Sequence, residues 1–139
     1  MPKYDKYDKP ALLPKVDGVE VLALGKRTTS AEELTFSMRG SAVFEVVACV
    51  KADKLLTQQI AQLWRVLPPG KQARCHVPPF ALRFFADGEI LMEASLCWHC
   101  NNICLREGET FSGYEFDGRA EVSRELLAVL TAISKAEEK

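Results

Sequence analysis

The alternation of apolar and polar residues along the chain predicts six to seven β-strands and two helices. Runs rich in Val, Leu, Ile and Phe that are bounded by Gly, Pro or Asp are typical of strands. They cover residues 19–24, 33–38, 42–50, 80–85, 89–96, 102–106 and 109–116. The run at 42–50 is apolar on nearly both faces, which indicates a central strand and places Cys49 in the core.

Two other segments have helical periodicity. Asp53 is a suitable N-cap for a helix over residues 54–67, which Pro68-Pro69-Gly70 would end. Its apolar stripe consists of Ala52, Leu55, Leu56, Ile60, Leu63, Trp64 and Leu67. Asp117 can cap a second amphipathic helix over residues 119–134. This order of elements predicts an α+β fold, a single domain in which a mainly antiparallel sheet carries both helices on one face.

Asp87-Gly88 lies between two alternating apolar runs and is the strongest hairpin signal in the chain. If these two residues form the centre of the turn, Phe85 lies opposite Ile90 and Phe84 lies opposite Leu91. The two strands therefore pair in an antiparallel hairpin with a defined register.

Extending this register outward places Cys75 opposite Cys100 and His76 opposite His99. Pro78 and Pro79 interrupt the ladder, because proline has no amide hydrogen to donate. We still expect Cys75, His76, Cys97, His99 and Cys100 to converge at one end of the hairpin, with Cys75 within roughly 7 Å of the Cys97–Cys100 turn between Cα atoms.

A weaker turn signal, Glu107-Gly108, predicts a second hairpin. Counting from this turn sets Cys104 opposite Phe111 and outside the cysteine cluster.

Length and composition fit one domain, since 139 residues with 47% apolar side chains can bury a sufficient core. Residues 1–18 are polar and contain several prolines, so we expect an extended arm there. The domain is expected to cover residues 19–135, followed by a charged tail at 136–139.

The charge balance excludes some classes of partner. Eighteen basic and nineteen acidic residues give a net charge of −1, so the chain has no overall attraction for nucleic acid or an anionic membrane. No apolar run approaches the ~18 residues needed to span a bilayer. The N-terminal segment lacks the apolar centre of an export signal, which indicates a cytoplasmic protein whose five cysteines remain thiols or bind metal.

The cysteine cluster suggests zinc binding as one function. Zinc favours four Cys or His ligands, and Cys97 and Cys100 have the two-residue spacing by which a turn holds a metal. Cys75 with either His76 or His99 would complete the site. Strict alternation argues against it, because it places Cys75 and Cys100 on the opposite face from Cys97 and the histidines.

Three other interpretations of the cluster remain open. Disulfide exchange at Cys97 would need an activated thiolate, but the motif follows a strand and not a helix N-terminus. A Cys/His nucleophile pair lacks a recognisable orienting acid. We favour the simplest interpretation, in which the cysteines are small buried residues, His99 and Trp98 pack at a bend, and Arg83 pairs with Glu93 or a helix acid.

The segment from Cys75 to Cys100 resembles a family of short uncharacterised proteins, chiefly bacterial. The family pattern begins Cys-Phe-x-Pro-x-His-Gly-Ile-Arg, continues through a turn with glycine, and closes with Cys-Phe-Glu-Cys. The shared residues are Cys75, Pro78, Arg83, Cys97 and Cys100. Phe80 and Ala81 stand in place of the family histidine and glycine. The resemblance implies that the cluster is important but implies no activity.

The features together predict a small non-catalytic binding protein that acts on a protein partner, as an inhibitor or immunity protein does. No catalytic constellation is recognised, so the chain is not expected to be an enzyme. Arg83 and Trp98 are candidate binding residues. Apolar strands at 42–50 and 81–85 offer more surface than two helices cover, so both a monomer and a homodimer remain open.

Overall fold

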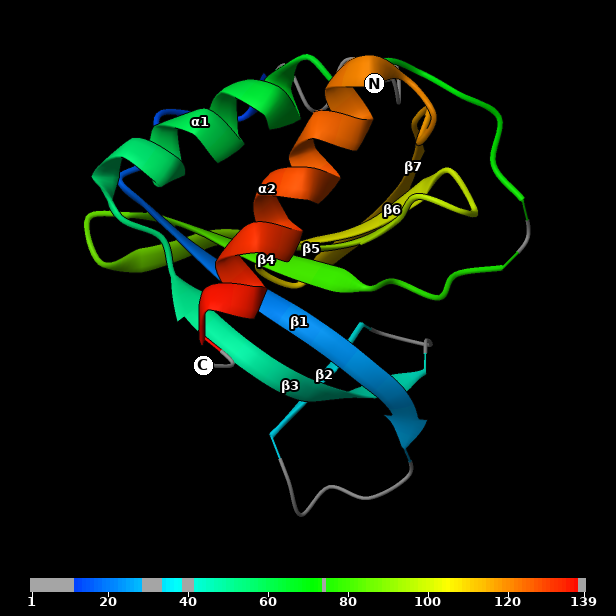
Figure 1. Cartoon of the computed structure of the whole chain (residues 1–139), viewed down its shortest axis with the longest axis horizontal. Coiled ribbons are helices and arrows are strands. Elements are labelled where there is room, and N and C mark those ends of the chain that lie inside the picture. The colour runs from blue at the N-terminus through cyan, green and yellow to red at the C-terminus, as the bar shows by residue number, and fades with distance from the viewer. Residues whose placement is uncertain (1–11, 29–33, 39–41, 74, 138–139) are drawn as a thin grey trace.

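The predicted α+β architecture is confirmed. The computed structural model describes residues 12–28, 34–38, 42–73 and 75–137, with side chains to residue 135. The elements are β1 (Gly18–Thr28), β2 (Thr35–Ser37), β3 (Val43–Lys51), α1 (Lys54–Arg65), β4 (Phe80–Ala86), β5 (Glu89–Cys97), β6 (Asn102–Glu107), β7 (Thr110–Glu115) and α2 (Glu121–Glu137). Figure 1 shows both helices on one side of the sheet.

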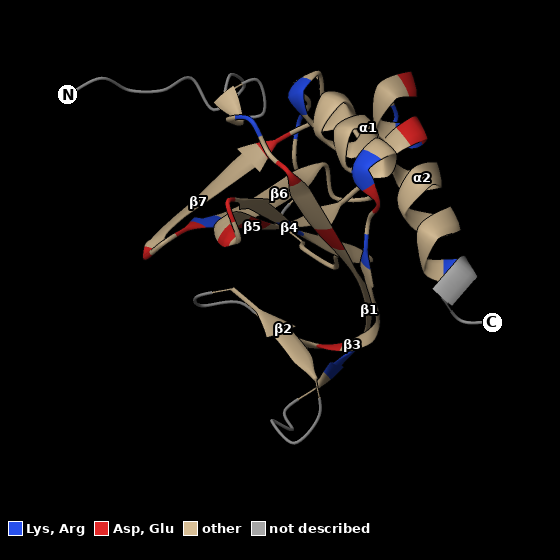
Figure 2. Ribbon diagram, turned by 90° about the vertical axis from the view of Figure 1, so that its left-hand side faces the viewer, with Lys and Arg blue, Asp and Glu red and all other residues tan. Residues whose placement is uncertain are grey.

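The seven strands form one sheet in the order β2-β3-β1-β4-β5-β6-β7, and every neighbouring pair is antiparallel. The sheet curls strongly, so that β2 and β3 fold back on the side away from the helices (Figure 2). We call the side away from the helices the concave face.

The main core lies between the helices and the sheet. Trp64 of α1 contacts Phe84 of β4 with ring centroids 5.2 Å apart. The helix begins where predicted, because the Asp53 carboxylate accepts a hydrogen bond from the amide of Leu56 at 2.8 Å. The predicted apolar stripe is confirmed except at Leu55, which is 82% exposed.

A second, smaller apolar cluster lies on the concave face. Phe36 of β2 and Met38 just after it pack against Leu22 of β1 and Ala81 of β4. The curl of the sheet lets β2 cover a strip of β1 and β4. The sheet therefore buries its own apolar surface here, which removes this reason for expecting a homodimer, while the oligomeric state stays a prediction.

The predicted position of the 42–50 strand is wrong. β3 is the second strand from one edge, between β2 and β1, and not a central strand. Phe44 is buried, but most of the other side chains of β3 are only partly covered. β1 pairs along the whole of β3, whereas the three residues of β2 cover only Val43, Phe44 and Glu45 on its other edge. Cys49, predicted in the core, is consequently exposed.

The first hairpin forms as predicted at its turn. Asp87 and Gly88 both have positive φ, at 52° and 80°, as a two-residue turn of this kind requires. Phe85 pairs with Ile90, but a bulge follows, so that Phe84 pairs with Met92 and not with Leu91.

The second hairpin is shifted from its predicted register. Glu107 pairs with Thr110, which makes Gly108 and Glu109 the central turn residues. Gly108 takes the positive φ of 58°. Cys104 therefore lies opposite Gly113, and not opposite Phe111.

Residues 12–17, which the sequence placed in the arm, pack against the domain. Leu13 and Val16 are buried. Arg65 of α1 donates a hydrogen bond to the carbonyl of Leu13 at 3.1 Å, and Gln58 donates one to the carbonyl of Val16 at 3.0 Å. The packed domain thus begins before the predicted boundary at residue 19. The remainder of the predicted arm, residues 1–11, and the tail residues 138–139 lie outside the described residues.

Candidate functional site

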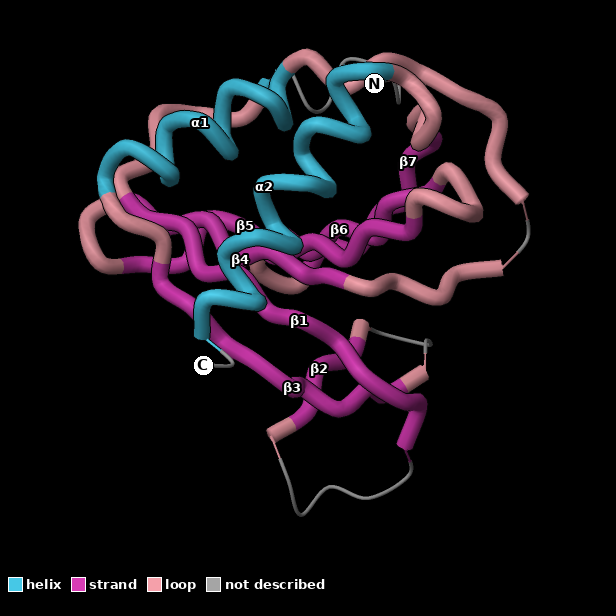
Figure 3. The backbone as a smooth tube through the Cα atoms, viewed as in Figure 1, coloured by secondary structure: helices cyan, strands magenta, loops and turns pink. Residues whose placement is uncertain are grey.

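The predicted proximity of Cys75 and Cys100 is confirmed, and the two residues form a disulfide with their Cα atoms 5.9 Å apart. The bond joins the end of the hairpin to the loop that connects α1 with β4, which Figure 3 shows as a long segment without regular structure. Ala73 in this loop also donates a backbone hydrogen bond to the carbonyl of Cys100 at 2.9 Å. The expectation that these two cysteines are thiols is therefore corrected.

Cys97 lies beside this disulfide but is itself a free thiol. It is the last residue of β5 and is buried. Its sulfur accepts a hydrogen bond from the amide of Cys100 at 3.3 Å. A buried thiol is thus held next to one half of the Cys75–Cys100 bond.

The described residues hold the predicted zinc ligands in other contacts, and zinc binding itself stays a prediction. The sulfurs of Cys75 and Cys100 are bonded to each other, so neither is a thiolate ligand in this form. His99 is exposed, and His76 points to other partners. Among the described residues, no group of three or more His, Cys, Asp or Glu side chains is placed to hold a metal ion.

Trp98, a predicted binding residue, is part of the core. Its indole N–H donates a hydrogen bond to the carbonyl of Ser123 in α2 at 2.7 Å. Its ring packs edge-on against Phe80 and Phe116. Only 8% of the residue is exposed, so Trp98 joins the hairpin to α2, and its part in binding a partner stays a prediction.

His76 forms a hydrogen-bonded chain with two side chains of the concave face. Its Nε2 lies 2.8 Å from the hydroxyl oxygen of Ser95 on β5, and its Nδ1 lies 2.6 Å from the side-chain oxygen of Asn102 on β6. The Asn102 amide group donates to the carbonyl of Cys75 at 2.6 Å, which turns its oxygen toward His76. Nδ1 therefore carries the proton, and Nε2 accepts one from Ser95.

This order of serine, histidine and amide resembles the catalytic arrangement of some hydrolases. The Ser95 residue, however, is 2% exposed. The space that it shares with Phe36, Met38 and Phe44 has no room even for a water molecule. No substrate can reach the hydroxyl in this structure, so the chain of hydrogen bonds fastens the Cys75 loop to the sheet.

Burial lowers the pKa of His76, and the hydrogen bond to Asn102 offsets this only in part. The folded protein thus favours neutral His76, whereas the unfolded chain has an ordinary pKa near 6.5. Stability from this residue should be complete above pH 6.5 and should decline as the pH falls through the lower, folded-state value.

We expect His76→Gln to remove this component of the pH dependence. Chemical denaturation at a series of pH values from 7.5 to about 5 measures it as the loss of unfolding free energy. His99→Gln is the matched control, because His99 is exposed, and it should retain the wild-type profile. A His76→Gln profile parallel to that of the wild type would contradict the assignment.

A row of alternating charges crosses the concave face. Glu20 on β1, Arg83 on β4, Glu93 on β5 and Arg106 on β6 occupy paired positions of adjacent strands. Arg83 donates to Glu20 and to Glu93, both at 2.7 Å, and Arg106 forms an ion pair with the other oxygen of Glu93. The predicted pairing of Arg83 with Glu93 is confirmed, and we call these four residues the charged row.

The pairing shifts the pKa values within the charged row. Burial acts to raise the pKa of Glu93, but its hydrogen bonds to Arg83 and Arg106 outweigh burial and lower it. Burial acts to lower the pKa of Arg83, and its bonds to Glu93 and Glu20 raise it. Glu93 and Arg83 therefore stay ionised over the physiological pH range.

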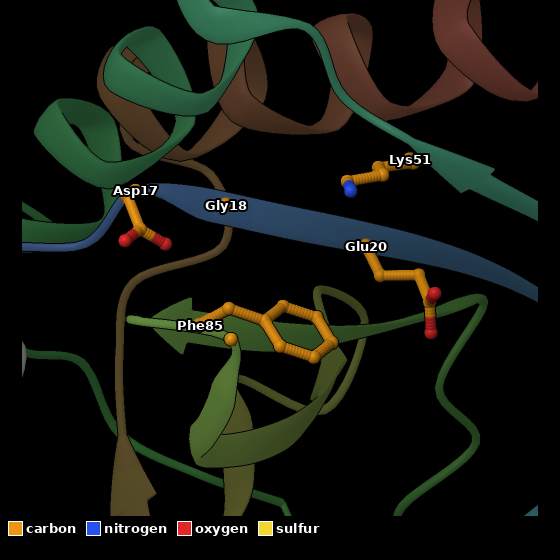
Figure 4. Close-up of a pocket in the computed structure, with 6 residues that line it drawn as sticks. Asp17, Gly18, Glu20, Lys51 and Phe85 are labelled. Atoms are coloured by element: carbon orange, nitrogen blue, oxygen red, sulfur yellow. The ribbon is translucent and has the colours of Figure 1, made fainter.

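A pocket of about 360 Å³ opens beside the Glu20 end of the charged row. It is lined by Asp17, Gly18, Glu20, Lys51, Phe85 and Gly88. Figure 4 shows the Phe85 ring and the carboxylates of Asp17 and Glu20 on the side of β1 away from the helices. The pocket thus combines an aromatic wall with side chains of both charges.

Sequence reasoning missed this pocket and most of the charged row. Glu20 and Arg106 are polar residues within the apolar runs of β1 and β6, which is a signal that could have found them. Only the strand order shows that Glu20 lies beside Arg83 and that Arg106 lies beside Glu93. Cys104 was also misplaced. Its thiol hydrogen-bonds with Ser95 and lies near Cys97, and burial raises its pKa.

The described part of the chain has no helix long and apolar enough to cross a membrane. Comparisons of the chain with protein-family models, with curated proteins and with solved structures found no match. The resemblance to uncharacterised bacterial proteins consequently stays a prediction.

Proposed function

We propose that this protein is a non-catalytic binding protein that receives a side chain of a protein partner in the pocket beside the charged row. The observation that supports this most is the pocket itself, which is open to solvent and lined by Phe85, Asp17, Glu20 and Lys51. Aromatic and charged side chains around a concave site are typical of recognition surfaces.

The surroundings of the pocket extend this surface. Ile90, which pairs with Phe85 across the hairpin, is 52% exposed. Arg83 and Glu20 retain about a quarter of their side-chain exposure, at 24% and 26%. A partner that fills the pocket would therefore also cover an apolar residue and the accessible end of the charged row.

The side chains of the charged row are held in place before a partner binds, which favours binding. Each charged group in it is held by a neighbour, so little conformational entropy is lost when a partner covers it. The hydrogen-bonded chain around Ser95 is closed to substrate, which favours recognition over catalysis as the role of the concave face.

Site-specific photo-crosslinking tests the position of the interface. A photoreactive residue at position 51, on the wall of the pocket, should crosslink to a protein partner in cells that produce the chain. The same residue at position 124, in a surface hollow on α2, is the control and should not. Equal crosslinking at both positions, or none at position 51, would rule out the pocket as the interface.

The crosslinked partner can then be purified and its affinity measured by calorimetry. Phe85→Ala should weaken binding at least tenfold, as expected for a central aromatic contact. Leu55→Ala, which removes an exposed apolar side chain on α1, should change the affinity less than twofold. An unchanged affinity of Phe85→Ala would contradict the proposed function.

A further inference from the structure

Three cysteines meet at the end of β5 in an arrangement suited to thiol–disulfide exchange. Cys75 and Cys100 are bonded, and Cys97 lies three residues before Cys100 in the turn. The amide of Cys100 donates a hydrogen bond to the sulfur of Cys97 at 3.3 Å. Exchange requires a thiolate next to a disulfide, and the amide hydrogen points at the atom that would carry the negative charge.

The three cysteine residues differ in their exposure to solvent. Cys97 and Cys100 are each 1% exposed, whereas Cys75 is exposed. External reagents can therefore reach Cys75 but not the other two. If Cys97 displaced Cys75 from Cys100, the cysteine that left would be the exposed one of the three.

We propose that Cys75, Cys97 and Cys100 form a thiol–disulfide exchange site with two disulfide forms. Cys97 loses its proton and its sulfur attacks the sulfur of Cys100. The Cys97–Cys100 bond forms as the Cys75–Cys100 bond breaks, and Cys75 leaves as a thiolate that takes up a proton. One disulfide and one thiol are present before and after, so no external oxidant or reductant is consumed.

The substrate class of the site is a small-molecule disulfide, R–S–S–R. The released Cys75 thiolate attacks one of its sulfurs, which forms a Cys75–S–S–R bond and releases R–S⁻. In a reducing cytosol, the location expected from the sequence, the disulfides that form are usually transient and are catalytic or redox-sensing. An exchange site is consistent with a disulfide in that compartment.

The neighbouring cysteine Cys104 serves as a control. It lies near Cys97, but burial raises the pKa of its thiol, and its hydrogen-bond partner is Ser95 on the concave face. It is therefore held as a protonated thiol and is not expected to take part in the exchange.

Native alkylation of the full chain tests the site. Iodoacetamide traps the Cys75 thiolate each time it is released, so the wild type should become alkylated at Cys75 and linked between Cys97 and Cys100, as read by peptide mass mapping. The rate should rise with pH between 7 and 8.5 as the thiolate fraction grows. Cys97→Ser should slow the reaction at least tenfold, and Cys104→Ser should leave it unchanged.

Cys75→Ser provides a second test that leaves Cys97 in place. Unfolded under reducing conditions and refolded with oxidised glutathione, which then reaches both thiols before they are buried, this variant should form the Cys97–Cys100 disulfide and recover a native circular dichroism spectrum. The exchange site is excluded if Cys97→Ser is alkylated at Cys75 as fast as the wild type. It is also excluded if oxidised Cys75→Ser keeps Cys97 and Cys100 as separate thiols or separate glutathione adducts.

Discussion

Replacing Glu93 with alanine is expected to lower the free energy of unfolding by about 3 kcal/mol, the range for removal of one partner from a largely buried ion pair. Glu93 is the only carboxylate between Arg83 and Arg106 in the charged row. Its side chain is 11% exposed, and those of Arg83 and Arg106 are 24% and 30% exposed. Without Glu93, the guanidinium groups of Arg83 and Arg106 remain close together and partly buried, with no carboxylate between them.

Urea denaturation measures this effect, and Glu89→Ala is its matched control. Glu89 lies on the same strand, but it is exposed at the edge of the turn, so its loss should change the stability by less than about 0.5 kcal/mol. A Glu93→Ala variant as stable as Glu89→Ala would show that the charged row contributes no net stability.

Loss of the Cys75–Cys100 disulfide is expected to destabilise the protein by about 3 kcal/mol, because the bond closes a loop that the unfolded chain would otherwise sample freely. The two cysteines are separated by 25 residues. Because Cys75 is exposed, Cys75→Ser removes the bond without leaving a cavity in the core.

The comparison is made by urea denaturation with and without a phosphine reductant. Reductant should destabilise the wild type to the level of Cys75→Ser, and it should leave unchanged a Cys75→Ser sample that was prepared with Cys97 and Cys100 as thiols. If reductant has no effect on the wild type, the disulfide does not contribute to stability by restricting the unfolded chain. If reductant destabilises both proteins equally, another bond is responsible.

The local elements could be read from the sequence because neighbouring residues determine them. Asp53 caps α1 through its own side chain, and Asp87-Gly88 takes the two positive φ values that few other residue pairs tolerate. From that turn alone, counting along the hairpin placed Cys75 near Cys100. Chain connectivity and strand periodicity are sufficient for such inferences.

The bulge at Phe84 could not be predicted from neighbouring residues. One extra residue shifts the pairing so that Phe84 meets Met92. A bulge bends its strand and increases the local twist, so its position depends on how the whole sheet curls and not on the residues of the strand alone. The same curvature brings Phe36 onto Leu22 and Ala81, although these residues lie in strands that the sequence could not order.

The sequence by itself thus determined the fold class, the first hairpin, both helices and the convergence of the cysteines. Only the tertiary structure decided that Cys75 and Cys100 are bonded, that His76 turns to Ser95 and Asn102, and that Trp98 is buried. The charged row and its pocket also depend on strand order. Periodicity shows which face of a strand is polar, but which strands lie side by side, and how far the sheet curls, follows from packing between residues distant in the chain.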